Sequence, residues 1–598
     1  SSWRGERLAA ALDSHPLFAG EALSVDWRRI LVLAGRLDRQ LRHLSLHCGG
    51  LVIVPDELRR YVPVEVAAKG LPMIQWEKDQ AEAAGLVKID ILGNRSLAVI
   101  RDALAAVEAN TGRRIDYAAW RPLEDEGTRD LLRSGATMGC FYIESPATRQ
   151  LLRRMWGENP PPAAQGADLF EHLVMASSII RPAANAYIRE FVARLRGAPW
   201  RCLHPLLAPV LGETYGLAIY QEQITRMAMA LAGFSAFDGD QLRKIVSKKH
   251  KAKKLEDYRR RFFAGGRGRQ VPPAVLEECW RQILSFAGYS FCKPHSASYA
   301  LVSCKSAWLK ANYPAEFMAA VISNQGGFYS PFAYLSEARR LGLEVLPPDV
   351  NASTWHYAGR ENKLRVGLMQ IQGLPRATAE NLVAERERGG PYRSCRDLLA
   401  RLRPEPAAAR LLIRAGAFDA LEGRARRPAL VWEVLAQQRV RGAAAGLFDA
   451  EPAGLPQPTG HDEAVLLRQE LAALGMLLSR HPLELHRRAL ARLKPVPAAE
   501  LGKWAGRYVT VAGWWVTGKT VRTREGQPME FITFEDTTAT FDTTFFPRAY
   551  ARFCRRLSRQ RPYLLKGKVE QEFGVATLTV EWVGFVDEGE EGAAAGDG

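Results

Sequence analysis

The residues best suited to bind a charged ligand are cations that recur at helical spacing. In the segment 242–250, Arg243 and Lys244 stand about one turn before Lys248 and Lys249. A helix there would present several cations on neighbouring turns to a triphosphate. The alternative for the same residues is an electrostatic contact with DNA that involves no nucleotide pocket.

A second phosphate-binding candidate lies in the segment 288–301. We predict that Lys293, His295 and Ser296 occupy a loop before the next helix. Hydroxyl and N–H groups at such a place can meet phosphate oxygens. Both segments therefore point to a ligand that carries phosphate.

The net charge of +17 is concentrated in one block. Between Arg243 and Arg269 there are twelve Lys and Arg residues against two acids, a net charge of +10. Such a block favours a polyanionic partner, because phosphate neutralisation releases counterions. A solvated basic helix face and a membrane-surface helix are the alternatives, and the block lacks the clean apolar stripe that the second requires. No window approaches eighteen apolar residues, so no membrane span is expected.

Histidine and cysteine patterns give little support for a metal site. His43 and His47 are four residues apart and would share a helix face, but no HExxH motif accompanies them. We interpret them as ordinary polar histidines. The eight cysteines form no C-x-x-C pair and are too sparse for a disulfide framework, which predicts a reducing compartment.

A tight glycine turn predicts a helix-hairpin-helix motif. In the segment 366–390, an apolar-Gly-apolar turn around Gly373 separates two expected short helices. Glycine lets the backbone approach a phosphate, and the following helix points N–H groups at it. Such contacts hold DNA without sequence preference. We interpret 414–418 as a second, decayed copy, and a plain αα-hairpin is the alternative for the first.

The elements that position these residues begin with a small α+β region. Residues 1–50 are expected to be helical, and strands are expected at 51–54 (buried), 73–76 and 85–93. Side chains alternate across a strand, so on the last of these Lys88 and Asp90 share one face and the apolar residues take the other. This region therefore displays a lysine and an aspartate side by side.

The rest of the chain changes character twice. Residues 111–330 are predicted to be mostly helical, with loops at 159–162 and at Gly265-Gly266, and 442–460 is predicted to be a linker. Five β segments then follow within 506–586, with one helix at 549–557 between the third and the fourth. This is the element order of an OB-fold barrel.

Several motifs occur in the order in which C-family bacterial DNA polymerases carry them. They lie at 85–93, 220–223, 248–249, 288–301, 308–317 and 346–351, and the segments 43–50 and 74–79 also resemble the palm of that family. The chain resembles the C-terminal two-thirds of the alpha subunit of DNA polymerase III, or of its error-prone relative. The resemblance covers nearly the whole chain.

The resemblance implies a multidomain α+β fold with a partial palm, helical fingers, a helix-hairpin-helix region and a C-terminal OB-fold β-barrel. The expected bounds are 1–110 for the partial palm, 111–330 for the fingers, 331–440 for the helix-hairpin-helix region, 441–505 for a linker and helical connector, 506–586 for the barrel and 587–598 for a disordered acidic tail.

The resemblance also implies template-directed DNA synthesis with two Mg²⁺ ions held by three palm aspartates. Asp90 matches the third aspartate, with Lys88 beside it, and a surface acid is the alternative for Asp90. Five cations match finger positions that meet the incoming nucleotide: Arg243, Lys244, Lys248, Lys249 and Lys293. The implied partners are primer-template DNA, dNTPs and other replication or repair subunits, in the bacterial cytoplasm at the nucleoid and without a membrane.

The chain departs from the family in what should precede Asp90. An Asp-x-Asp pair and a PHP domain are expected well over a hundred residues upstream, and the one Asp-x-Asp here, Asp238-Gly-Asp240, is interpreted as a helix cap. One carboxylate cannot hold two Mg²⁺ ions, so we expect a fragment or split-gene product that is inactive alone. Sliding-clamp binding through Leu447-Phe448 is expected to be weakened, because Ala444 stands at the glutamine position of that motif.

Two function classes stay open. The first is a DNA polymerase of the error-prone, translesion repair branch, favoured by the short linker, the incomplete clamp motif and the end of the chain soon after the barrel; a fragment of a replicative alpha subunit is its variant. The second is a non-catalytic DNA-binding module. Protection of residues 243–296 from proteolysis by Mg²⁺ and dNTP would separate the two classes.

Overall fold

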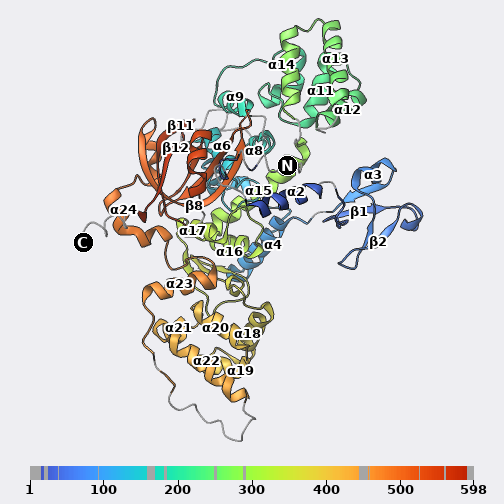
Figure 1. The fold of residues 1–598 in the computed structure, drawn as a ribbon. Coiled ribbons are helices and arrows are strands. Elements are labelled where there is room, and N and C mark those ends of the chain that lie inside the picture. The colour runs from blue at the N-terminus through green and yellow to red at the C-terminus, as the bar shows by residue number, and fades with distance from the viewer. Residues whose placement is uncertain are drawn as a thin grey trace. The chain divides into compact units, whose positions relative to one another are not determined.

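The computed structural model describes residues 12, 15–18, 24–37, 40–91, 93–157, 169–180, 185–247, 252–286, 291–442, 455–456, 458–523, 525–557 and 561–588. Its packing separates two units, drawn in Figure 1. The first unit comprises 1–95, 521–529 and 546–557, and the second comprises 96–520, 530–545 and 558–598.

The first unit contains short strands and helices. Its elements are α2 (Val25–Arg36), β1 (Gly50–Ile53), β2 (Val64–Val66), β3 (Pro72–Ile74), α3 (Lys78–Ala83), β4 (Val87–Asp90) and α25 (Pro547–Phe553). β1 pairs antiparallel with β4, and β2 with β3. The three predicted strands are present. The helix expected over 1–50 is wrong for 40–49, where the His47 side chain accepts the Gly49 and Gly50 N–H groups and so competes with a helical ladder.

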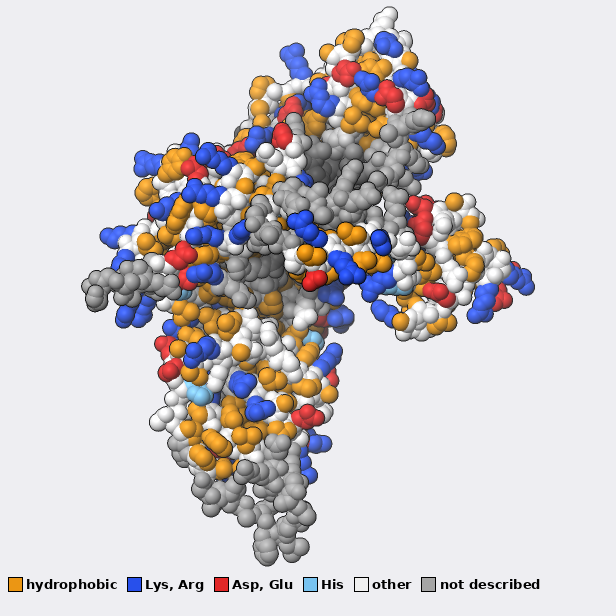
Figure 2. Space-filling model, in the orientation of Figure 1, with side chains coloured by type: hydrophobic (Ala, Val, Ile, Leu, Met, Phe, Trp, Pro, Cys, Tyr) orange, Lys and Arg blue, Asp and Glu red, His pale blue; other side chains and the backbone are white. Residues whose placement is uncertain are grey.

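The apolar face of the β1–β4 sheet is exposed. Leu51 and Ile53 are 53% and 54% exposed, and their cross-strand partners Ile89 and Val87 are 43% and 58% exposed. The prediction of a buried strand at 51–54 is therefore wrong, because the sheet has two strands and none of the described elements covers this face. Hydrophobic side chains are visible in Figure 2 on the surface of the region that carries the labels β1, β2 and α3 in Figure 1.

The second unit begins with a long helical region. Its helices are α4 (Arg95–Thr111), α5 (Glu126–Arg133), α6 (Pro146–Trp156), α8 (Leu169–Ile179), α9 (Asn185–Leu195), α10 (Ala208–Leu211), α11 (Gln221–Ala232), α12 (Ala236–Ser247), α13 (Ala252–Gly268), α14 (Pro273–Leu284), α15 (Lys293–Asn312), α16 (Pro314–Asn324) and α17 (Pro331–Arg340). Helices α11 to α14 pack around a core of their own that includes Phe262 and Trp280. The mostly helical prediction for 111–330 is confirmed over the described residues.

The Gly265-Gly266 pair lies inside α13, so the loop predicted there is wrong. A Cβ atom at Gly265 would lie 2.1 Å from the carbonyl oxygen of Ala232, and one at Gly266 would lie 2.4 Å from a methyl group of Leu276. The two glycines therefore let α13 approach α11 and α14 closely. The loop predicted at 159–162 lies outside the described residues.

A mixed region follows and contains both predicted glycine turns. Its elements are β5 (Glu344–Leu346), β6 (Ala358–Arg360), β7 (Lys363–Arg365), α18 (Arg376–Gly389), α19 (Cys395–Leu402), α20 (Pro406–Arg414), α21 (Asp419–Glu422), α22 (Arg427–Gly442), α23 (Glu463–Leu474) and α24 (Arg487–Leu493). Gly373 precedes α18 with φ +79°, and Gly416 separates α20 from α21 with φ +81°. Both turns use a backbone conformation that favours glycine.

The C-terminal strands close into a barrel. They are β8 (Tyr508–Arg522), β9 (Pro528–Glu535), β10 (Thr540–Phe545), β11 (Tyr563–Glu572) and β12 (Val575–Phe585), in the order β10-β12-β11-β8-β9. The five predicted β segments are confirmed, and a helix, α25, follows the third in sequence. Beyond β12, Asp587 pairs with Arg561 at 2.8 Å, so this first residue of the predicted acidic tail is held in place.

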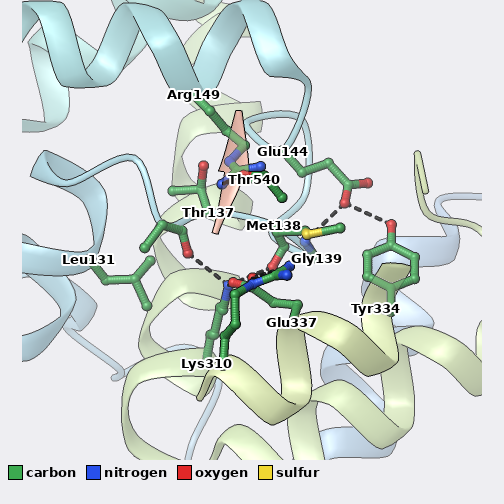
Figure 3. A network of polar contacts seen from close by, with 12 residues as sticks. Leu131, Thr137, Met138, Gly139, Glu144, Arg149, Lys310, Tyr334, Glu337 and Thr540 are labelled. Atoms are coloured by element: carbon green, nitrogen blue, oxygen red, sulfur yellow. Dashed lines mark hydrogen bonds and ion pairs between the residues drawn. The ribbon is translucent and has the colours of Figure 1, made fainter. Parts of the chain in front are cut away.

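Buried charges join the helical region to the barrel. Lys310 on α15 donates to the carbonyl oxygens of Ala136 and Met138 and forms an ion pair with Glu337 on α17 at 2.7 Å (Figure 3). Arg340 bridges Glu337 to Glu535 on β9, at 3.1 and 2.9 Å. The network therefore ties α15, α17 and a barrel strand together.

Stability of the second unit is expected to fall as the pH drops from about 4.5 toward 2. Burial raises the pKa of Glu337, but Lys310, Arg340 and Arg149 outweigh it and lower the pKa from 4.5 to about 2. The unfolded chain therefore takes up this proton first, so the stabilisation is complete above 4.5 and is lost as the pH falls through about 2. Amide hydrogen exchange in α15 and α17, measured at successive pH values and corrected for the intrinsic exchange rate, should show a shallower pH dependence of stability for Glu337→Gln, and an equal dependence would contradict the assignment.

Candidate active site and phosphate-binding residues

Lys88 and Asp90 lie on one face of β4, as the alternation predicts. The Lys88 ammonium group donates a hydrogen bond to Oδ1 of Asp90. This bond lowers the pKa of Asp90 below its ordinary value, against the smaller effect of desolvation, and the positive charge of Lys78 acts in the same direction. Asp90 is therefore an ionised carboxylate at neutral pH, held by Lys88 and half-exposed, with 48% of its side chain accessible.

The residue opposite Asp90 on β1 is Gly50. A Cβ atom there would lie 2.8 Å from Nδ1 of His47, 2.9 Å from Cε of Lys88 and 3.0 Å from Oδ1 of Asp90. Three polar side chains therefore converge over a position that has no side chain of its own. Glycine at this register position makes the convergence possible.

Sequence reasoning missed His47. We expected it on a helix face together with His43, but the structure places it in the non-helical approach to β1, with Nδ1 3.9 Å from Asp90. The available signal was the position of 43–50 directly before a strand that would pair with the strand of Asp90. The sequence could not show which strand pairs with which.

A magnesium ion fits this site in part. Carboxylate oxygen is a preferred ligand of Mg²⁺, which proteins commonly bind through one or two carboxylates together with substrate phosphates and water. Asp90 offers one such ligand. Among the described residues, no group of three or more His, Cys, Asp and Glu side chains is arranged to hold a metal ion.

The cations of α12 are tied to a neighbouring acid. Arg243 and Lys244 pair with Asp240 at 2.8 and 2.9 Å, and this lowers the pKa of Asp240. Asp238 pairs with Arg261 on α13 at 2.8 Å. The Asp-x-Asp pair thus lies within α12, and both aspartates form ion pairs. The interpretation of the pair as a helix cap is wrong, because the capping residue is Ser235, whose hydroxyl oxygen accepts the N–H of Asp238.

The comparisons with family models and with curated proteins point to the same group of proteins. Family models match at 96–270 (bacterial DNA polymerase III alpha subunit finger domain), 342–429 (helix-hairpin-helix motif) and 8–93 (bacterial DNA polymerase III alpha NTPase domain), together more than half of the chain. The chain is 34% identical over 568 residues to the DNA polymerase III subunit alpha of Thermus aquaticus, which covers 91% of this chain and 45% of the relative. The chain belongs to the C family of bacterial DNA polymerases.

Relatives named error-prone DNA polymerase match equally well. That of Symbiobacterium thermophilum is 32% identical over 618 residues, covering 94% of this chain and 55% of the relative. That of Anaeromyxobacter dehalogenans is 34% identical over 585 residues, covering 93% and 50%. The chain therefore spans about half the length of the curated relatives it matches. The finger and helix-hairpin-helix regions expected of a C-family polymerase are confirmed.

The second group of C-family candidates lies at the start of α15. Lys293, His295 and Ser296 occupy its first turns, so the loop predicted there is wrong, and Pro294 in the first turn is the local signal for a helix start. The ammonium group of Lys293 pairs with Glu171 at 3.1 Å and with Glu213 at 2.9 Å.

The two neighbours of Lys293 differ in accessibility. The ring of His295 is exposed and stacks on Phe291 with centroids 5.1 Å apart, while the Ser296 hydroxyl is buried against Ser178 at 2.6 Å. Their phosphate-binding roles stay predictions, and burial does not favour that of Ser296. Two further predicted sites, Lys248-Lys249 and the Leu447-Phe448 clamp motif, lie outside the described residues.

Proposed function

We propose that this chain takes part in template-directed DNA synthesis, the transfer of a nucleotide from a dNTP to a primer 3′-hydroxyl. The observation that carries the proposal is Asp90, which matches a C-family metal-binding aspartate and stands ionised beside Lys88 on β4. The family match around it supports the reaction class. The whole reaction, its substrates and its partners belong to this proposal.

The chain's own residues would act through charge and position. Lys88 orients the Asp90 carboxylate, which would supply one ligand to Mg²⁺. When bound, Mg²⁺ neutralises charge on the triphosphate and increases the reactivity of the primer hydroxyl. Arg243 and Lys244 would exchange their pairing with Asp240 for triphosphate oxygens, as Lys293 would exchange its two glutamates. On this proposal, the candidate finger cations form ion pairs with acidic side chains when no nucleotide is bound, and contact the triphosphate when it is.

Duplex binding would fall to the glycine turns and the barrel. Gly373 lies in the turn three residues before the start of α18 at Arg376, so backbone N–H groups at the start of that helix can approach a phosphate. None of the described helices has the length and apolar character needed to cross a bilayer. We propose DNA as the partner of the basic residues.

Further carboxylates would complete the metal site. We propose that they come from another polypeptide segment that packs against this region. The face of the sheet opposite Asp90 is apolar and exposed, at Leu51, Ile53 and Ile89, and part of that segment would cover it. Exposed apolar patches of this kind mark interaction surfaces. On this proposal, the chain alone binds DNA and nucleotide but does not extend a primer.

Protection from proteolysis is expected to separate an enzyme from a DNA-binding module. With primer-template DNA bound, Mg²⁺ and dNTP together should slow cleavage within 243–296, because triphosphate contacts order the cations there. A module without chemistry would bind DNA with the same salt sensitivity, about 0.9 in log K per log salt for each phosphate contact, and show no dNTP effect. Absence of dNTP protection would therefore overturn the proposed function and leave the module.

We also propose the error-prone branch of the family. The feature that favours it is Ala444 in place of the clamp-motif glutamine, which would reduce the processivity that a replicative enzyme needs. Primer extension across a damaged template by a polymerase containing this chain tests the assignment. A stop at the lesion, with rapid synthesis on undamaged DNA, would favour the replicative alternative.

A further inference from the structure

The side chain of His47 is fixed by backbone donors. Its Nδ1 accepts the N–H of Gly50 at 2.6 Å and that of Gly49 at 3.1 Å. A nitrogen that accepts hydrogen bonds carries no proton, so these contacts assign the ring proton to Nε2. The ring is therefore held in one tautomer and one orientation by the turn that leads into β1.

The other ring nitrogen is an unused donor. Over the residues that the structure describes, the Nε2 of His47 has no hydrogen-bond partner, and 46% of the side chain is exposed. The 3.9 Å approach of Nδ1 to Asp90 is not a hydrogen bond, because the two backbone groups already occupy Nδ1. The backbone has thus oriented a neutral N–H donor beside the candidate metal carboxylate.

The surroundings of this donor suit a phosphate group. His47, Lys88 and Asp90 converge over Gly50, where a Cβ atom would lie 2.8 to 3.0 Å from an atom of each of them. Lys88 supplies a positive charge, Asp90 a ligand for Mg²⁺, and His47 an uncharged donor that needs no counter-ion. These are complementary contacts for a metal-bound phosphate.

We propose that His47 is a phosphate-binding residue, whose Nε2–H donates to a non-bridging oxygen of the nucleotide triphosphate, or of the pyrophosphate it releases. The inference rests on the proposed function, since it places the triphosphate beside Asp90. Gly50 is the matching positioning residue, because its lack of a side chain leaves room for the ring. Neither role follows from the spacing of His43 and His47.

Two substitutions separate this role from a purely structural one. In His47→Asn the side-chain oxygen takes the place of Nδ1 and still accepts the backbone N–H groups, but the Nε2 donor is gone. In His47→Gln the amide nitrogen takes the place of Nε2, but the acceptor for Gly49 and Gly50 is gone. We would titrate the 598-residue chain and both variants with Mg²⁺-pyrophosphate and with Mg²⁺-dATP by calorimetry.

The proposal expects His47→Asn to weaken both ligands by about tenfold to hundredfold, the value of a hydrogen bond to a charged group. His47→Gln should stay within about threefold of the wild type. The reverse order, equal losses in the two variants, or wild-type binding by His47→Asn would overturn the proposal. In wild-type protein labelled with ¹⁵N-histidine, Mg²⁺-pyrophosphate should shift the Nε2 resonance of His47, and an unchanged Nε2 would also overturn it.

An Asp90→Asn arm keeps the two proposals distinguishable. If the wild type binds Mg²⁺-dATP and Asp90→Asn does not, the proposed function stands, and the two His47 variants together with the Nε2 resonance decide the role of His47. If the wild type binds neither ligand, the proposed function fails and the inference fails with it.

Discussion

Replacing Lys310 by methionine is expected to lower the unfolding free energy of the region that contains α15 and α17 by about 3–5 kcal/mol. The Lys310 side chain is fully buried and Glu337 is 9% exposed. Methionine fills a similar volume but removes one ion pair and the donor to two carbonyl oxygens. A buried carboxylate without its main partner is costly, because water cannot solvate it there.

The second partner of Glu337 sets the lower end of that range. Arg340 remains 3.1 Å from Glu337, and it also serves Glu535 on β9. The double variant Lys310→Met/Glu337→Gln should therefore recover part of the loss, because the uncompensated charge disappears. An additive loss in the double variant would show that the two side chains do not act as a pair.

Hydrogen exchange of amides in α15 and α17 is the appropriate measurement, because a chain of several domains does not unfold in one step. The matched control is Lys363→Met, which removes a pair 4.0 Å from Glu344 with 53% and 58% of the side chains exposed. Exposed pairs contribute about 0–1 kcal/mol. A Lys310→Met loss no larger than that of the control would contradict the role assigned to the buried network.

Local patterns in the sequence predicted the barrel and the Lys88–Asp90 face well. Polar and apolar residues alternate along a half-buried strand with a period of two, so five or six residues are enough to recognise one in the sequence. The same rule could not show that the apolar side of β4 is exposed, since burial depends on what packs above the sheet. The loop predicted at Gly265-Gly266 was wrong for a related reason. Close packing of α13 against Ala232 and Leu276 outweighs the low helix propensity of the two glycines.

The sequence indicated Lys88 and Asp90 as candidate site residues, but not His47 and not the arrangement of the three side chains. Asp90 was identified through a motif, whereas His47 depends on the pairing of β1 with β4 and on two backbone N–H groups. The candidate finger cations were selected by their charge and by the family resemblance, whereas their glutamate and aspartate partners were not predicted. Lys293 is separated along the chain from its partners Glu171 and Glu213 by 122 and 80 residues, and no local sequence rule spans such distances.

Asp90→Asn is expected to have the largest effect on activity, a loss of at least about a thousandfold in nucleotide addition by a polymerase containing this chain. A metal-held carboxylate contributes several kcal/mol to transition-state stabilisation, and about 4 kcal/mol corresponds to a thousandfold in rate. Asparagine keeps the shape of the side chain and can still accept the Lys88 hydrogen bond, so β4 and its pairing with Gly50 should persist.

Single-turnover incorporation at saturating dNTP measures the effect on the chemical step. The matched control is Asp56→Asn, which removes the same charge from the same unit at an exposed pair with Arg60 and should leave the rate unchanged. Thermal unfolding of the two variants should agree. A loss below about tenfold for Asp90→Asn would show that this carboxylate holds no catalytic metal ion, because removing a metal ligand weakens the charge stabilisation on which phosphoryl transfer depends. The Lys88–Asp90 pair would then be a surface ion pair, and the polymerase reaction would have to draw its metal ligands from elsewhere.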